Sequence, residues 1–91
     1  MSSVTRTHEI INVKGLHARA SAKFVEVVEE FDAMATVTKD GLDAGGDSIM
    51  GLLMLAASKG TSIEVTTDGS EATALADALE ALIKDRFGEG M

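Results

Sequence analysis

The sequence predicts an α+β domain of the open-faced sandwich type, in which a four-stranded antiparallel sheet is covered on one face by three helices. Segments rich in β-branched residues alternate with segments whose apolar residues recur every three or four positions, in the order β-α-β-β-α-β-α. Two Asp-Gly dipeptides mark tight turns between such segments. Both kinds of element must bury an apolar side, so one layer of helices on one face of one sheet satisfies them together.

Length and composition limit the class of protein. With 91 residues and 45% hydrophobic content, residues 1–91 fit one domain and leave no room for a second. The absence of cysteine excludes a disulfide framework and thiolate chemistry, and the formal charge of −7 argues against general binding to nucleic acid or anionic membranes. The N-terminus lacks a signal-like apolar stretch, and the longest apolar run, residues 52–57, is too short to cross a bilayer. We therefore expect a cytoplasmic protein.

The first third of the chain predicts a strand followed by a helix. Residues 5–13 are rich in β-branched side chains, as is typical of a strand, although their apolar alternation is not clean. From Ala18 onward, apolar side chains recur at three- and four-residue steps until the pattern fades near Asp32, which places them on one helical face. This face consists of Ala20, Phe24, Val27, Val28 and Phe31.

Three further segments predict strands. Residues 34–38 and 42–44 flank Asp40-Gly41, the kind of dipeptide that most favours a hairpin turn, so two short antiparallel strands are expected. Residues 61–67 alternate Ile and Val with polar side chains and are followed by Asp68-Gly69, a pattern typical of a half-buried strand that ends in a turn.

Two more helices complete the chain. Ser48 precedes the apolar residues 49–57, and Lys59 and Gly60 follow them, so a cap, a last-turn cation and a terminal glycine together predict a helix. Ser70 is expected to cap the final helix. The apolar face of that helix consists of Ala72, Leu75, Ala76, Leu79, Leu82 and Ile83.

A small basic island surrounds His17. Residues 10–25 contain no acidic side chain, while Lys14, Arg19 and Lys23 fall inside the same stretch. In a chain of net charge −7, an anionic group is therefore expected to bind here if it binds anywhere.

The position of His17 at a predicted helix start favours phosphate chemistry. Unpaired backbone N–H groups and the positive end of the helix dipole converge there and, with Arg19, disfavour a second positive charge on the ring. Only the neutral imidazole has the lone pair needed to attack phosphorus. The N–H groups at Ala18 and Arg19 and the Arg19 guanidinium are suited to hold the phosphoryl oxygens. On spacing alone, however, a His-x-Arg pair is more often an ordinary helix start.

The sequence predicts neither a metal site nor a cofactor. His17 has no second histidine or carboxylate at helical spacing, and the other histidine, His8, falls in the predicted first strand, where it packs or points to solvent. A self-contained enzyme is also disfavoured, because no second acid or base accompanies His17.

The helix that follows Ser48 is apolar nearly all round. Ile49, Met50, Leu53 and Ala57 share one arc, and other apolar residues lie on the remaining sides. A short helix on one face of a sheet cannot bury every side, so part of this surface is expected to be an exposed patch for a partner. The alternative is a core helix covered by its neighbours. Ser48 as a cap needs no functional explanation by itself.

The motifs GLHARA, SAKFVEVVEEF, DSIMGLLMLAASKG and SIEVTTDG, in this order, resemble the phosphocarrier protein HPr of the bacterial phosphoenolpyruvate-dependent phosphotransferase system from end to end. The family pattern Gly-Leu-His-Ala-Arg falls on residues 15–19. The resemblance implies that His17 takes a phosphoryl group on a ring nitrogen from phosphorylated enzyme I and passes it to an enzyme IIA-type acceptor. The sequence departs from the family pattern at Ala20, where many members carry proline.

The resemblance also covers the helix after Ser48. The family's Ser-Ile-Met segment, its regulatory serine and docking surface, falls on Ser48, Ile49 and Met50. Phosphorylation of Ser48 by an HPr kinase/phosphorylase is thereby implied, although Asp47 stands where many members have lysine. We expect Leu53 and Lys23 to join the docking residues, and phosphate on Ser48 to leave the fold intact while it weakens docking to enzyme I.

The sequence thus predicts a monomeric phosphocarrier that holds a transferred group on His17, rather than an enzyme that turns over a small molecule. Ala20 and residues 51–60 look more like the nitrogen-related, NPr-like branch than like a sugar-uptake HPr. Two alternatives remain at this point. One is a regulatory interaction module switched only by phosphorylation of Ser48, and the other is a passive ligand-binding domain in which neither residue is modified.

Overall fold

Strands and helices follow one another in the predicted order in the computed structural model, which describes residues 3–90. The strands are β1 (Ser3–Glu9), β2 (Met34–Lys39), β3 (Leu42–Gly45) and β4 (Ser62–Asp68). The helices are α1 (Ala18–Glu29), α2 (Ile49–Met54) and α3 (Ala72–Lys84), and a single 3₁₀ turn, η1 (Arg86–Gly88), follows α3. The open-faced sandwich predicted from the sequence is confirmed.

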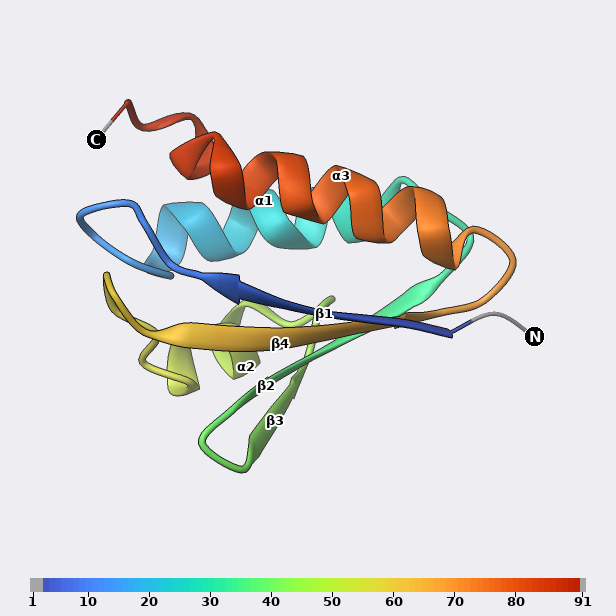
Figure 1. Cartoon of the computed structure of the whole chain (residues 1–91), viewed down its shortest axis with the longest axis horizontal. Coiled ribbons are helices and arrows are strands. Elements are labelled where there is room, and N and C mark those ends of the chain that lie inside the picture. Colours follow the sequence, from blue (N-terminus) through green and yellow to red (C-terminus); the bar gives the residue numbers. More distant parts are fainter. Residues whose placement is uncertain (1–2, 91) are drawn as a thin grey trace.

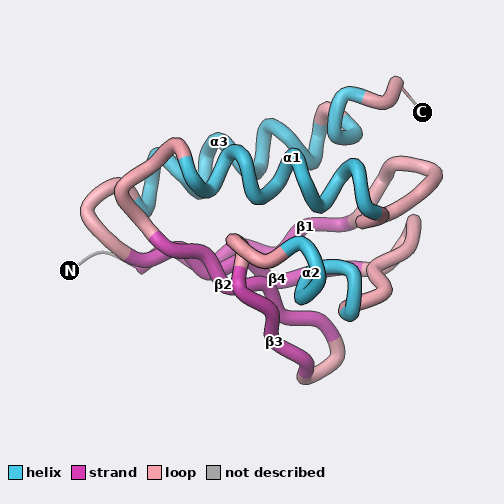
Figure 2. Tube along the Cα trace, turned by 180° about the vertical axis from the view of Figure 1, so that it is seen from behind, coloured by secondary structure: helices cyan, strands magenta, loops and turns pink. Residues whose placement is uncertain are grey.

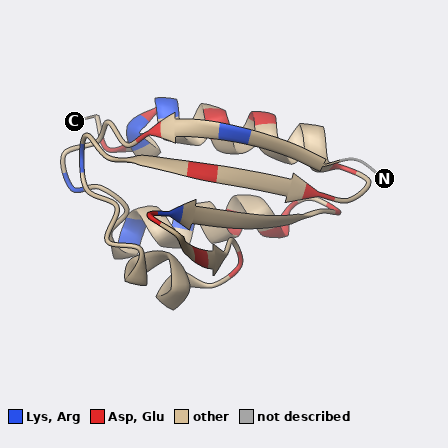
Figure 3. Ribbon diagram, turned by 60° about the horizontal axis from the view of Figure 1, so that its bottom comes forward, with Lys and Arg blue, Asp and Glu red and all other residues tan. Residues whose placement is uncertain are grey.

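The four strands form one antiparallel sheet in the order β1-β4-β2-β3. Along β4, Ile63, Val65 and Thr67 are buried while the residues between them are not, so only one face of the sheet is covered. Helices α1 and α3 lie side by side over that face (Figures 1 and 2), and α2 contacts α1 and β3. Figure 3 shows the uncovered face of the sheet in front, with the two long helices, α1 and α3, behind it.

The core between the two layers includes an anchor for the C-terminal segment. Phe24 of α1 and Phe87 of η1 are both fully buried. Arg86 and Phe87 adopt left-handed backbone conformations, with φ of 53° and 54°, so the chain turns sharply after α3 and returns Phe87 to the core. Burial of a phenylalanine side chain stabilises a fold by roughly 1.5–3 kcal/mol. Residues 88–90 are therefore held beside the start of α1, at one end of the molecule (Figures 1 and 2).

Two predicted ends were wrong because long-range hydrogen bonds compete with the local pattern. Strand β1 ends at Glu9 instead of residue 13, and α2 ends at Met54 instead of continuing to Gly60. The backbone N–H of Leu16 donates to the oxygen of Ala57 at 2.8 Å, and the N–H of Gly60 donates to the oxygen of Ile10 at 2.8 Å. These bonds join the segment before α1 to the segment after α2.

The predicted capping role of Ser70 was also wrong. The N-cap of α3 is Glu71, and the Ser70 hydroxyl instead donates to the backbone oxygen of Asp32 at 3.2 Å and to its carboxylate at 2.7 Å. The hairpin prediction is confirmed, since Asp40 and Gly41, with φ of 51° and 80°, join β2 to β3. Two positive φ angles are the geometry that an Asp-Gly turn between twisted strands requires.

Gly15 is expected to be required for stability, because it lies in the left-handed region, at φ +66°, and against the segment after α2. An added Cβ would lie 2.5 Å from the oxygen of Ala57 and 2.9 Å from Cα of Ser58. Gly60 has φ +90° but nothing within 4 Å of its Cβ position, so Gly60→Ala is a matched control. Gly60→Ala should cost only the backbone preference, about 1–2 kcal/mol, and Gly15→Ala clearly more. Urea unfolding measures both, and equal losses would contradict the packing argument.

His8 predicts a loss of stability as the pH falls. Its side chain is buried beneath α3, and burial lowers the pKa of the ring below its usual 6.5, with Arg6 and Lys84 acting in the same direction and Glu80 against them. The unfolded chain therefore binds the proton more tightly. The free energy of unfolding should fall as the pH drops through 6.5 and level off below the lowered pKa of the folded state.

Urea unfolding of the native chain and of His8→Gln across this range measures the effect. The native chain should lose stability relative to the variant as the pH falls, because only the native chain carries the buried ring. Parallel curves would show that His8 is not the group responsible.

Candidate functional site

His17 is the N-cap residue of α1. Its backbone is extended, with φ −79° and ψ −174°, and its oxygen accepts the first helical hydrogen bond from the N–H of Ser21 at 2.8 Å. The imidazole makes no capping bond, so it projects from the helix start, and 27% of the side chain is exposed. Within residues 3–90, the N–H groups of Ala18 and Arg19 have no hydrogen-bond partner. These two donors lie next to the ring, as the helix geometry requires.

The cations of the basic island meet at this helix start. Lys14, Arg19 and Lys23 line a hollow of about 200 Å³ together with Gly88 and Glu89. Figure 3 shows most of the Lys and Arg segments toward the end of the molecule where the C-terminus lies. Among the described residues, Arg19 makes no hydrogen bond or ion pair, and its side chain is exposed. An anion that enters the hollow therefore meets an unpaired guanidinium.

Lys23 has a second contact that the sequence did not predict. Its ammonium group donates to the backbone oxygen of Phe87 at 2.6 Å, so it ties α1 to the C-terminal segment. Lys23 thus lines the hollow beside Arg19, and its ammonium group also forms the hydrogen bond that holds the C-terminal segment.

Glu89 is the residue of the site that sequence reasoning missed. Its Oε2 contacts Nε2 of His17, and its Oε1 accepts a hydrogen bond from Nδ2 of Asn12 at 3.0 Å. The pKa of Glu89 is lowered, mainly by the hydrogen bond from Asn12. Burial opposes this shift, and the contact with His17 acts in the same direction as Asn12. The expectation that the neighbours of His17 only disfavour positive charge is therefore incomplete. No local signal marks this contact, because the two residues are 72 positions apart.

Helix α2 carries an exposed apolar patch. Ile49, Met50 and Met54 are 40%, 69% and 75% exposed, and Leu53 is half-buried beside them, whereas Leu52 faces the core. We call Ile49, Met50, Leu53 and Met54 the α2 patch. Ala57, which helical spacing placed on the same arc, is buried because α2 ends before it. Met54 was not among the predicted docking residues, although it lies one helical turn after Met50.

Ser48 caps α2 as predicted, since its Oγ accepts the N–H of Gly51 at 3.0 Å. The α2 patch and His17 also share a surface depression. A hollow of about 290 Å³ has His17 and Lys14 on one side and Leu53 on the other. A molecule that covers the α2 patch therefore borders the imidazole as well.

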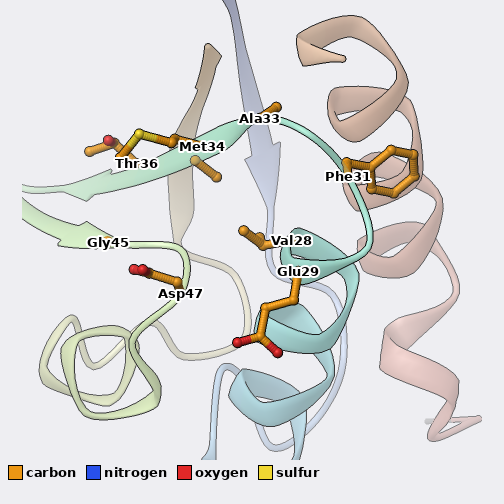
Figure 4. A pocket seen from close by; sticks show the side chains of 9 residues that line it. Val28, Glu29, Phe31, Ala33, Met34, Thr36, Gly45 and Asp47 are labelled. Atoms are coloured by element: carbon orange, nitrogen blue, oxygen red, sulfur yellow. The ribbon is translucent and has the colours of Figure 1, made fainter. Parts of the chain in front are cut away.

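A different hollow of about 290 Å³ lies at the opposite end of α1, beneath Phe31 and Met34 (Figure 4). Its only charged lining residues are Glu29 and Asp47, which repel an anion. The residues that suit a phosphoryl group are therefore those around His17. Residues 3–90 hold no group of three potential metal ligands and no helix long and apolar enough to span a membrane.

The sequence is similar to known phosphocarrier proteins over most of its length. Residues 4–85 match the family described as the PTS HPr component phosphorylation site. The phosphocarrier protein HPr of Neisseria meningitidis serogroup B is 52% identical over 82 residues, which cover 90% of this chain and 92% of that protein. The phosphocarrier protein NPr of Shewanella violacea is 38% identical over 89 residues, which cover 98% of each.

Solved structures agree with this similarity. The crystal structure of HPr-C-His from Thermoanaerobacter tengcongensis superposes with a TM-score of 0.90 at 36% identity and covers 100% of both chains. An HPr dimer from the same organism has a TM-score of 0.76 at 36% identity and covers 90% of this chain and 94% of that one. The match over residues 4–85 contains His17 and Arg19. This chain belongs to the HPr family of phosphotransferase-system phosphocarriers.

Proposed function

We propose that His17 accepts a phosphoryl group from phosphorylated enzyme I and passes it to an enzyme IIA-type acceptor. The observation that carries this proposal is the partly exposed imidazole at the start of α1, beside the hollow lined by Lys14, Arg19 and Lys23. The ring supplies the nucleophile, and the free N–H groups and the Arg19 guanidinium supply donors for the phosphoryl oxygens. Acceptance of the group and stabilisation of its charge then depend on neighbouring residues of one helix start.

The α2 patch is proposed as the surface on which both protein partners dock. Met50 and Met54 are flexible and exposed, and such side chains adapt to more than one partner. A partner that covers the patch and the depression beside Leu53 brings its own reactive group to His17. The nearby cations favour partners with an acidic rim around an apolar centre. Lys23 contributes to this potential while it holds Phe87.

Ser48 is proposed as a regulatory site for an HPr kinase/phosphorylase. A phosphate there adds about −1.5 to −2 charge at the edge of the α2 patch. The start of a helix tolerates negative charge, so the fold should remain, whereas a partner with an acidic rim is repelled. The competing function is a regulatory module that works only through Ser48, and its distinguishing feature is that loss of His17 leaves it unaffected.

The finer classification also belongs to this proposal. The similarity to an NPr protein fits the nitrogen-related branch. In that branch the output is regulation rather than sugar uptake. The cytoplasm is the proposed compartment. We propose a monomer, because His17 and the α2 patch border one depression within a single chain. A similar protein forms an HPr dimer, so sedimentation velocity is the test of the monomer.

Incubation with enzyme I and phosphoenolpyruvate should add one phosphoryl group to the native chain and none to His17→Ala. The group should be lost in acid and survive base, as expected for a nitrogen–phosphorus bond. Arg19→Ala should still be modified, but about tenfold more slowly, because one charge-assisted contact is lost. Intact-mass measurement with site mapping decides the question. A native chain that stays unmodified while a kinase labels Ser48 would favour the regulatory module instead.

Ser48→Asp and Ser48→Ala should separate charge from capping. Aspartate still caps the helix, so Ser48→Asp should unfold at nearly the native urea concentration but bind enzyme I several-fold more weakly. Ser48→Ala loses the bond to the N–H of Gly51 and should cost about 1 kcal/mol of stability, with enzyme I affinity unchanged. Calorimetric titration measures the affinities. Equal affinities for the two variants would refute the role of charge.

A further inference from the structure

We propose that the hollow at the C-terminal end of α1 (Figure 4) docks a protein partner, which inserts a basic side chain there and packs an apolar side chain beside it. We call it the acidic hollow, because Glu29 and Asp47 line it together with apolar residues such as Val28 and Met34. His17 lies at the other end of α1, so the inference does not depend on phosphoryl transfer.

The lining of the acidic hollow is largely apolar. Val28 and Ala35 are buried, whereas 75% of Met34 is exposed. An exposed methionine beside buried apolar side chains offers a partner a flexible surface to pack against. The volume of about 290 Å³ is at the lower end of the roughly 300–1,000 Å³ found for pockets of free organic ligands. The hollow therefore suits one side chain of a larger molecule, whose further contacts add to the affinity.

Two carboxylates in the acidic hollow are available to a cation. Glu29 belongs to α1 and Asp47 to the segment after β3, so they come from different sides of the hollow (Figure 4). Both residues are exposed, and within residues 3–90 neither carboxylate forms a hydrogen bond or an ion pair. None of the described lining residues is a lysine or arginine. An ammonium or guanidinium group that enters therefore displaces no existing partner and meets negative charge on two sides.

A second depression continues the same surface. It has a volume of about 360 Å³, shares Phe31, Ala33 and Met34 with the acidic hollow, and is also lined by Asp32 and Asp68. The shared apolar residues thus have carboxylates on both sides. A partner that matches this arrangement presents one apolar side chain with a basic side chain on each side of it.

Backbone packing fixes the shape of this surface before a partner binds. The N–H of Gly46 donates to the oxygen of Ala35 at 2.7 Å, which ties the segment after β3 to β2. A Cβ at Gly69 would lie 2.9 Å from Cα of Ala33, so glycine allows the turn after β4 to lie against the segment after α1. A surface that is formed in advance loses little conformational entropy on binding.

Charge complementarity identifies the occupant. The carboxylates of the acidic hollow and of the depression beside it attract a basic surface, and such attraction also speeds the encounter of two proteins. A second copy of this chain has the same formal charge of −7 and is repelled over a distance, as is an anionic membrane. The occupant is therefore a different protein with a basic rim around an apolar centre. The partners proposed for the α2 patch have the opposite charge.

NMR titration of the isotope-labelled chain with short peptides tests the proposal. The probe is the capped pentapeptide Lys-Ser-Leu-Ser-Lys, whose lysines and leucine share one face when it is extended. It should shift the amide signals of residues 28–36 and 45–47. The matched peptide Glu-Ser-Leu-Ser-Glu should bind at least tenfold more weakly, because its charges are repelled from the same surface.

Two pairs of variants separate the acidic hollow from the net charge. Glu29→Gln combined with Asp47→Asn should weaken binding of the lysine peptide about tenfold, as expected for two exposed ion pairs. The control combines Glu30→Gln with Glu64→Gln, which removes the same charge from exposed residues outside the lining, and should lose less than about twofold. Met34→Ala should weaken binding about threefold, whereas Met50→Ala in the α2 patch should leave it unchanged.

Several outcomes overturn the inference. Equal losses in the two double variants would mean that net charge alone attracts the peptide. Signal shifts centred on the α2 patch would place the binding there instead. If n-butylammonium binds as tightly as the lysine peptide, the hollow is a site for small amines rather than for a protein. If the amides of residues 28–36 shift with the concentration of the chain alone, its occupant is a second copy. All of these readouts are independent of enzyme I and of His17.

Discussion

The backbone hydrogen bonds between the segment before α1 and the segment after α2 are the constraint on which the functional surface depends. Leu16 donates to Ala57, Gly60 donates to Ile10, and Ile10 donates to Thr61, each at 2.8 Å. These bonds place the start of α1 beside the end of α2. His17 and the α2 patch border one depression for this reason, although about thirty residues of sequence separate them.

The same constraint explains the shape of α2. The oxygen of Ala57 and the N–H of Gly60 are used in bonds to the loop before α1, so the helix cannot include them and stops at Met54. In a longer helix, Ala57 would lie on the same arc as Ile49, Met50 and Leu53. In the observed structure Ala57 is buried and Met54 is exposed instead. A short apolar helix at the margin of the sandwich has too few neighbouring elements to bury all of its sides. Its methionines therefore stay exposed, where a partner can contact them.

Electrostatics at the site combine a general and a local effect. The chain is acidic overall, yet Lys14, Arg19 and Lys23 line one hollow, so the local potential favours an anionic group there over the rest of the surface. Glu89 is placed inside this basic cluster by the burial of Phe87 and by Asn12. The site therefore contains both cationic side chains suited to an anionic group and a carboxylate beside the imidazole of His17.

The sequence by itself determined the element order, the Asp40-Gly41 turn, the buried faces of α1 and α3 and the cap at Ser48, and it predicted His17 and Arg19 as the residues of the site. All of these depend on signals between residues close in sequence, namely periodicity, turn chemistry and capping. Only the tertiary structure decided where β1 and α2 end, that Ser70 bonds to Asp32, and that Glu89 contacts His17. These features arise from contacts between distant parts of the chain, whose competition with local preferences leaves no pattern in the sequence.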